Sequence, residues 1–249
     1  MYLLRLAVVF FIFVYPQNIL ADAIYEHFDD GAVAYKKGDY KTAEKEFIEA
    51  AKTGDYRAMT ILGHMYFEGI GVDKDYKKAY KWFSQAAKYN FTQAEYNLGL
   101  MYDEGTGVSK NYKKAARLYN KAARQGYAPA QHRLGMLYAR GHGVEQSNVK
   151  AYAWLVVAGV FFNDVLSDVK EEDAEGVEVI APESMYLITV ELKRIRKELT
   201  TEQIEETKQL METYIKYRKI YRVHTLEGGQ ISSDDQYLYF PEYFYQIID

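Results

Sequence analysis

Residues 58–72 read AMTILGHMYFEGIGV, and the same pattern returns as AEYNLGLMYDEGTGV at 94–108 and as AQHRLGMLYARGHGV at 130–144. The copies follow one another at a period of 36 residues without a gap. A fixed period of this length is typical of repeat architectures, in which each unit buries its apolar face against its neighbours. The repeat, and no single motif within it, therefore predicts the fold class.

Each copy has the pattern of a helix–turn–helix. Apolar residues recur at three- and four-residue steps in the first half, at Ala58, Leu62, Met65 and Tyr66. Gly69 follows where a residue at the end of a helix needs positive φ, which costs other L-residues about 1–2 kcal/mol. The second half begins with a capping residue in every copy, Asp75, Asn111 or Ser147. The sequence thus predicts two packed helices per unit.

The same register extends backward by one more unit. Asp39 lies 36 residues before Asp75, and DYKTAEKEFIEAAKTG at 39–54 matches the pattern of the second helix. Its first helix, DDGAVAYKKG at 29–38, is joined to it by a shorter link. The first unit is therefore predicted to be a tetratricopeptide-like repeat, and the next three a variant with a longer loop.

The full pattern A-x-x-x-L-G-x-x-Y-x-x-G-x-G-V-x-x-x-x-x-x-A-x-x-W resembles the Sel-1-like repeat (SLR) family, a relative of tetratricopeptide repeats. The resemblance covers residues 28–163. It implies an all-α fold, a right-handed α-solenoid of helix–turn–helix repeats with a C-terminal helical extension, and usually protein–protein interaction. Two departures stand out. The third unit ends in VVAGVFFND at 156–164, and the first unit lacks the long loop.

The amino end has the layout of a secretory signal. Arg5 precedes a short apolar run at 6–15, Pro16 follows, and Ala21-Asp22-Ala23 is an A-x-A sequence. The run is about half the ~20 residues that a spanning helix needs, although an uncleaved anchor is the alternative. We therefore expect an exported chain, periplasmic or secreted, without stable membrane insertion after cleavage.

The remaining segments follow from composition and pattern. Residues 163–181 carry seven acidic side chains and one lysine, as is typical of a solvated connector. Thr200 and Gln203 form a capping box, and an exposed last repeat calls for a closing helical pair. The expected segments are 1–21 as signal peptide (cleaved near Ala21 or Ala23), 24–57 as the first repeat, 58–93, 94–129 and 130–163 as SLR units, 164–181 as acidic linker, 182–224 as closing helical pair and 225–249 as aromatic tail.

The aromatic tail and the overall composition bear on partners. The tail, DDQYLYFPEYFYQIID at 234–249, is expected to dock in cis or in trans, with possible self-association, unless it is disordered. The formal net charge of −4 gives no reason to expect nucleic acid. The chain has no cysteine, which excludes disulfides and a thiol nucleophile.

No catalytic arrangement is predicted. The G-x-G of residues 69–71 follows a helix, whereas a phosphate loop follows a strand, so it is interpreted as a turn. The five histidines show no metal-ligand spacing. We therefore expect a non-catalytic protein with no metal and no cofactor.

The candidate site is the concave face that the resemblance assigns to the first helices, between the packing positions. Its residues differ from unit to unit, as on a recognition surface or on an ordinary solvated face. They are Thr60, His64, Phe67 and Glu68, then Tyr96, Leu100, Asp103 and Glu104, then His132, Met136 and Arg140. The expected function is a scaffold or adaptor that binds a protein or peptide of unknown identity outside the cytoplasm. The alternatives are a cell-envelope regulator of a membrane sensor or wall enzyme, and a secreted host-interaction factor.

Overall fold

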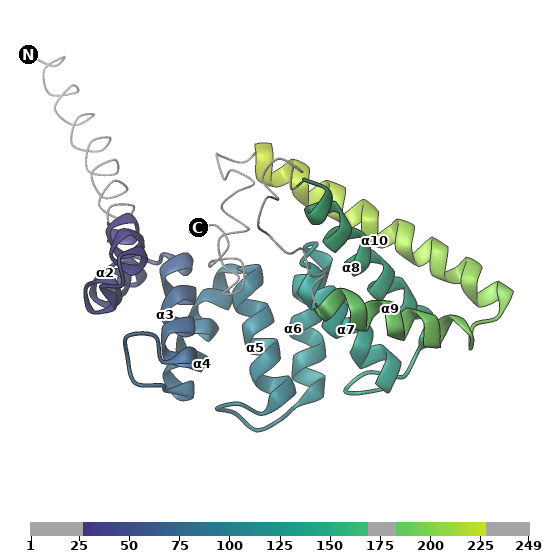
Figure 1. Ribbon diagram of the computed structural model, residues 1–249, viewed down its shortest axis with the longest axis horizontal. Coiled ribbons are helices and arrows are strands. Elements are labelled where there is room, and N and C mark those ends of the chain that lie inside the picture. Colours follow the sequence, from purple (N-terminus) through teal and green to yellow (C-terminus); the bar gives the residue numbers. More distant parts are fainter. Residues whose placement is uncertain (1–26, 169–182, 228–249) are drawn as a thin grey trace, which may run out of the picture. The chain divides into compact units, whose positions relative to one another are not determined.

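The computed structural model describes residues 27–168 and 183–227, in which all secondary structure is helical (Figure 1). The expected signal peptide, most of the acidic linker and the aromatic tail lie outside these residues. The helices are 27–36, α2 (Tyr40–Lys52), α3 (Tyr56–Glu68), α4 (Tyr76–Ala86) with the 3₁₀ turn η1 (Ala87–Tyr89), α5 (Thr92–Glu104), α6 (Tyr112–Arg124), α7 (Ala128–Arg140), α8 (Asn148–Asp168), α9 (Glu183–Arg196) and α10 (Thr201–Glu227). The all-helical, solenoid-like fold class predicted from the repeats is confirmed.

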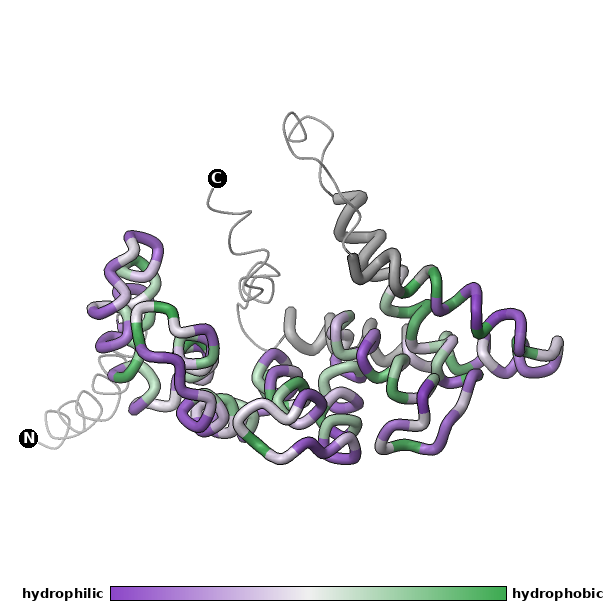
Figure 2. Tube along the Cα trace, turned by 60° about the horizontal axis from the view of Figure 1, so that its bottom comes forward, coloured by the Kyte–Doolittle hydropathy of each residue, from purple (hydrophilic) through white to green (hydrophobic). Residues whose placement is uncertain are grey.

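The described residues form two compact units, which divide between Ala94 and Glu95: unit 1 before this point and unit 2 after it. Within each unit, hydrophobic and hydrophilic stretches alternate along the helices in Figure 2, as expected for helices that bury one face. The buried side chains are mostly small or aromatic. The largest fully buried side chains include Phe47, Phe83 and Leu62 in unit 1, and Tyr119, Leu134 and Leu155 in unit 2.

The repeated glycine inside each first helix accommodates a large side chain from the second helix of the same repeat. A Cβ built on Gly63 would lie 2.4 Å from Phe83 Cε1, and one on Gly99 would lie 2.5 Å from Tyr119 Cε1. Real Cβ atoms do not come so close, so these positions require glycine. The two helices of each repeat therefore come into close contact at this glycine.

The predicted caps at the second helices are also present. The side chain of Asp75 accepts hydrogen bonds from the backbone N–H groups of Lys77 and Lys78, at 2.9 and 3.0 Å. Asn111 accepts one from Lys114 at 3.0 Å, and Ser147 accepts one from Lys150 at 3.3 Å. Each cap satisfies a donor that the first turn of a helix leaves without a partner.

The two glycines of each loop have different roles. Gly69 ends α3 with φ 78°, as predicted, and Gly141 ends α7 with φ 69°. The second glycine packs against the preceding repeat. A Cβ on Gly71 would lie 2.0 Å from Tyr40 Cβ, and one on Gly143 would lie 2.3 Å from the carbonyl carbon of Tyr112. The loop is therefore a contact between neighbouring repeats as well as a turn.

The last repeat of unit 2 differs from the expectation in length. Helix α8 has 21 residues, against 13 in α6, and continues to Asp168 through the start of the segment predicted as a linker from residue 164. The apolar run at 156–162 continues the helical pattern, and no proline interrupts the chain before the helix ends at Asp168. The predicted linker boundary is therefore wrong by about one turn.

Helices α9 and α10 cover the apolar side of this last repeat. Ile188 and Ile195 of α9 and Leu199 join Leu155 and Ala158 of α8 in one buried cluster. The indole ring of Trp154 stacks on the ring of Tyr214 in α10, with 3.8 Å between centroids and 11° between planes. Burying this face stabilises the end of the unit, since each such side chain contributes about 1.5–3 kcal/mol when removed from water.

The capping box at the start of α10 gives a first prediction. Gln203 accepts a hydrogen bond from the Thr200 N–H at 3.0 Å, and Thr200 Oγ1 accepts one from the Gln203 N–H at 3.2 Å. Thr200→Ala should lower the free energy of unfolding by about 1 kcal/mol, measured by urea unfolding. Thr201→Ala, one residue inside the helix, is the control and should not destabilise the chain. Equal losses in both variants would contradict the role of the cap.

Candidate functional site

Apart from Thr60, the predicted site residues lie at half-buried or exposed positions of the first helices, here called the first-helix face of each unit: α3 in unit 1, and α5 and α7 in unit 2. Their exposure follows the repeat. His64, Leu100 and Met136 occupy one register position and are all half-buried. Glu68, Glu104 and Arg140 occupy another and are all exposed. Each first helix therefore presents a partly apolar row beside an exposed charged end.

In unit 1, Thr60 does not belong to this exposed face. It is fully buried, and its Oγ1 donates a hydrogen bond to the carbonyl oxygen of Tyr56 at 2.8 Å. The prediction that Thr60 faces a partner is therefore wrong. The equivalent residues of α5 and α7, Tyr96 and His132, carry larger side chains and are half-buried.

The other unit 1 residues are positioned by aromatic contacts. The imidazole of His64 lies edge-on to the ring of Phe83, with 5.2 Å between centroids. The ring of Phe67 meets that of Tyr76 in the same way, also at 5.2 Å. Burial lowers the pKa of His64 to about 4, so this side chain is neutral at pH 7. Only Glu68 extends fully into solvent.

In unit 2, residues of the first-helix face contact buried and half-buried tyrosines. Tyr96 lies between Tyr119 and Tyr127, with centroid distances of 5.8 and 5.2 Å. The Tyr119 hydroxyl donates a hydrogen bond to Oδ2 of Asp103 at 3.1 Å, and burial raises the pKa of Tyr119 well above its usual range. Tyr96 and Asp103 are therefore partly committed to internal contacts.

The structure adds Arg133, which was not predicted. Its guanidinium lies between α7 and α5, 3.9 Å from Asp103 Oδ2 and 3.8 Å from Glu104 Oε1. Its side chain stays 40% exposed, so a further acceptor can reach it. The equivalent residues Ile61 and Asn97 are buried, and the register therefore indicated a packing position. The sequence feature that could have identified Arg133 is a long cationic side chain at a packing position, because such a side chain is rarely buried without a partner.

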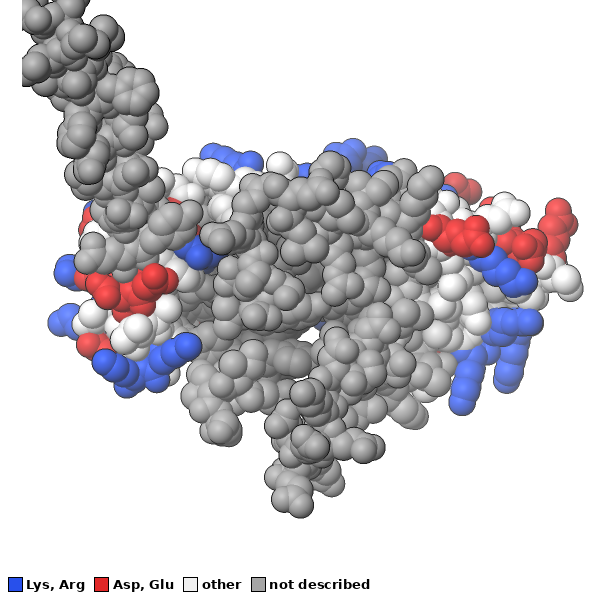
Figure 3. Space-filling model, turned by 90° about the horizontal axis from the view of Figure 1, so that it is seen from above, with Lys and Arg blue, Asp and Glu red and all other residues white. Residues whose placement is uncertain are grey.

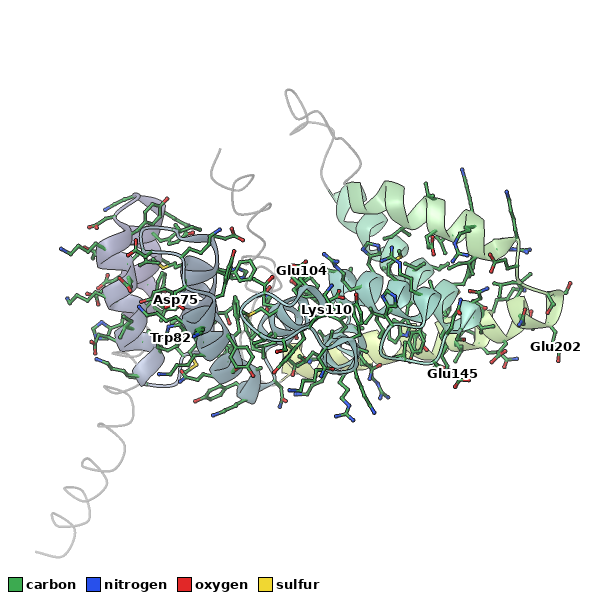
Figure 4. All side chains as sticks on the ribbon, turned by 90° about the horizontal axis from the view of Figure 1, so that it is seen from below. Asp75, Trp82, Glu104, Lys110, Glu145 and Glu202 are labelled. Atoms are coloured by element: carbon green, nitrogen blue, oxygen red, sulfur yellow. The ribbon has the colours of Figure 1, made fainter. Side chains whose placement is uncertain are left out.

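The rest of the unit 2 face combines apolar and charged groups. Leu100 and Met136 pack against the two buried clusters of the unit while remaining partly exposed. Arg140 is exposed at the end of α7, and Glu104 projects at the end of α5 (Figure 4). Half-buried apolar groups next to exposed charges are suited to bind a polypeptide segment.

His132 gives a pH-dependent prediction. Its Nε2 is buried without a hydrogen-bond partner among the described residues, and burial, together with Arg133 and Arg140, lowers its pKa to about 4. The unfolded chain binds a proton near pH 6.5, whereas the folded chain does not, so stability is complete above pH 6.5 and falls as the pH drops toward 4. The contribution of His132 to this slope should stay below the about 1.4 kcal/mol per pH unit of a fully linked group, and His64, whose pKa is also about 4, contributes separately.

Thermal unfolding of the chain between pH 7 and pH 4 would measure this slope. His132→Gln should reduce it, leaving the contribution of His64, and His142→Gln, in the loop before α8, is the matched control. An unchanged slope in His132→Gln would show that other groups cause the acid sensitivity.

The described residues contain neither a metal-binding group nor a membrane-spanning helix. Residues 27–168 and 183–227 contain no group of three or more His, Cys, Asp or Glu side chains placed to hold a metal ion. Within the same ranges, none of the helices combines the length and the apolarity that crossing a bilayer requires.

Known proteins place these features in context. The family model of the Sel1 repeat matches residues 57–88, 92–127 and 128–158. A Sel1 repeat protein from Oxalobacter formigenes is similar in structure with a TM-score of 0.51 and 31% identity, over 66% of this chain and 69% of that one. No curated protein matches the chain.

A second solved structure is similar over a larger part of this chain. It is a protective antigen present in uropathogenic Escherichia coli strains and displays an SLR fold. The TM-score is 0.58 and the identity 30%, over 77% of this chain. This chain spans only 37% of the length of that protein.

Proposed function

Because the chain belongs to the Sel1 repeat family, we propose that it is a non-catalytic scaffold that binds a protein or peptide segment on its first-helix face, outside the cytoplasm. Sel1 repeats generally mediate protein–protein interaction, and the fold typically serves as a scaffold without catalysis. The residues that pack the helices repeat from unit to unit, whereas those on the first-helix face change. Residues that do not pack the helices against one another can change without loss of the fold, so they can make this surface specific for one partner.

One observation carries this proposal. On α5 and α7, the half-buried Leu100 and Met136 lie on the same face as Arg133, whose two ion pairs are long. A partner segment would bury the apolar pair, and its carboxylate or carbonyl oxygens would complete the coordination of the guanidinium. Such a combination provides both affinity and orientation.

The location rests on the sequence of the amino end, whose charged start, apolar run and A-x-A boundary support export. The similarity to a protective antigen of pathogenic bacteria favours a secreted host-interaction role as the second candidate. A cell-envelope regulator remains the other alternative. Fractionation with amino-terminal sequencing of the mature chain tests export, and an intact Met1 in the cytoplasmic fraction would exclude it.

Charge exchange on the first-helix face tests the binding site. Glu104→Lys/Arg140→Glu keeps the net charge and changes exposed groups. It also removes the long ion pair of Glu104 with Arg133, but such an exposed pair contributes little, so folding should be almost unaffected. Affinity capture from the native organism should lose the specific partner at least about ten-fold, since two interface charges become repulsive.

Lys197→Glu/Glu206→Lys makes the same exchange on two exposed residues, Lys197 in the turn after α9 and Glu206 in α10, and serves as the control. It should capture the partner as the unaltered chain does. Equal recovery of every protein by both variants would contradict the first-helix face as the binding surface.

A further inference from the structure

The outer side of α6 in unit 2 is a row of cations without an acidic residue. The row consists of Lys113, Arg117, Lys121 and Arg124, all exposed. At 100° and 1.5 Å per residue, these positions lie within an arc of about 80° and extend over about 16 Å of the helix. The 13 residues of α6 contain no Asp or Glu, in a chain whose acidic side chains (35) outnumber its basic ones (31). Overall charge therefore does not explain the row.

The residues at the same register positions in the other second helices show whether this side of the helix is buried or exposed there. In α8 of the same unit, these residues are Val149, Ala153 and Val157, which are all buried in the repeat that α9 and α10 close. In α4 of unit 1 three of the four are cationic and exposed, Lys77, Lys81 and, beyond the helix, Lys88, whereas the fourth is the half-buried Gln85. The outer side of the second helix is thus apolar in α8, where α9 and α10 cover it, and carries exposed cations in α4 and α6.

Two of the four cations have no ion-pair partner among the described residues: Lys113 and Arg117, in the first half of the row. The other two interact within the unit. Lys121 Nζ lies 2.5 Å from Oε1 of the buried Glu95, and Arg124 interacts electrostatically with Tyr214 of α10. The surface of α9 and α10 is of the opposite kind: acidic and basic side chains lie side by side there (right side of Figure 3), and Arg194 contacts both Glu191 and Glu198.

We propose that the outer side of α6 binds the surface of an anionic lipid bilayer. The large apolar side chains that are exposed among the described residues are Val33, Tyr76, Tyr89 and Val190, and none of them belongs to α6. A protein partner would need a desolvated aromatic or apolar anchor, and a single-stranded nucleic acid would need stacking platforms. A bilayer surface needs only cations held near its headgroups.

The interaction is peripheral, because the apolar side of α6 is buried in its own unit. Ala115, Ala116 and Tyr119 of this helix belong to the core cluster. The proposal is independent of the first-helix face, which lies on other helices. A chain that adheres to an anionic membrane by α6 keeps its first-helix face free to bind a partner.

Vesicle sedimentation with the full chain tests the proposal. The vesicles are phosphatidylcholine with about one third phosphatidylglycerol, compared with pure phosphatidylcholine. Each cation near such a surface strengthens binding about five-fold, so Lys113→Gln/Arg117→Gln should lower the partition coefficient about 25-fold. Both residues are exposed, so the melting temperature should not change.

Lys193→Gln/Lys197→Gln removes the same charge from exposed residues at the end of α9 and should bind within about two-fold of the unaltered chain. Added salt should release the chain from the vesicles, because exposed charges are screened. Equal losses in both variants, or equal binding to pure phosphatidylcholine, would overturn the proposal. So would tight binding to polyglutamate or duplex DNA without binding to the anionic vesicles.

Discussion

Replacing Tyr119 by alanine is expected to lower the free energy of unfolding by about 3–5 kcal/mol, as for other large aromatic side chains removed from a core. The ring is fully buried and belongs to the core cluster of unit 2. It also lies directly against Gly99, which has no side chain that could move into the space. The cavity would therefore remain largely open, which sets the cost at the upper part of the usual range.

Tyr119→Phe is the matched control. It keeps the ring and removes only the hydroxyl that donates to Asp103. A hydrogen bond to a charged acceptor contributes about 1.5–3 kcal/mol, so the phenylalanine variant should lie between the unaltered chain and Tyr119→Ala. Urea unfolding followed by circular dichroism measures both. Equal free energies of unfolding in the two variants would show that the ring does not hold the unit together.

Gly143→Ala is expected to lower the free energy of unfolding by about 3 kcal/mol. Its φ of +71° costs an L-residue about 1–2 kcal/mol. The new methyl group would also lie 2.3 Å from the Tyr112 carbonyl carbon, and this backbone cannot move aside cheaply. Such overpacking adds about 1–3 kcal/mol.

Gly141→Ala separates the two contributions. Gly141 has nearly the same φ, +69°, but its Cβ would lie 3.2 Å from Gln146 Cβ, which can give way. This variant should lower the free energy of unfolding only by the cost of the positive φ, about 1–2 kcal/mol. The difference between the variants measures the contact of the loop with the preceding repeat, and equal losses would contradict that contact.

Several features could be predicted because they depend on nearby residues. Asp75 caps α4 because its side chain reaches N–H groups two and three residues away. Gly69 takes positive φ because a helix must end there. The side chains of Thr200 and Gln203 each accept a hydrogen bond from the other residue's backbone N–H, within one turn. In each case, backbone hydrogen bonding within a few residues decides the outcome, and the sequence displays all the groups involved.

The candidate site was only partly predictable. The half-buried row of His64, Leu100 and Met136 followed from the repeat register, since equal positions in equal helices have equal surroundings. Thr60 and Arg133 broke this rule. One is buried where exposure was expected, and the other reaches two carboxylates on a different helix. Both outcomes depend on side chains from neighbouring helices, which the register of a single helix does not describe.

The sequence by itself determined that this chain is a stack of helical pairs, because period, apolar spacing, caps and glycines are local and repeat together. Only the tertiary structure decided what each surface does. It showed that the second loop glycine serves the contact between repeats, that α8 is extended and covered, and that the outer side of α6 is left basic. These features depend on which helix lies next to which, and burial is a property of neighbours brought together by folding.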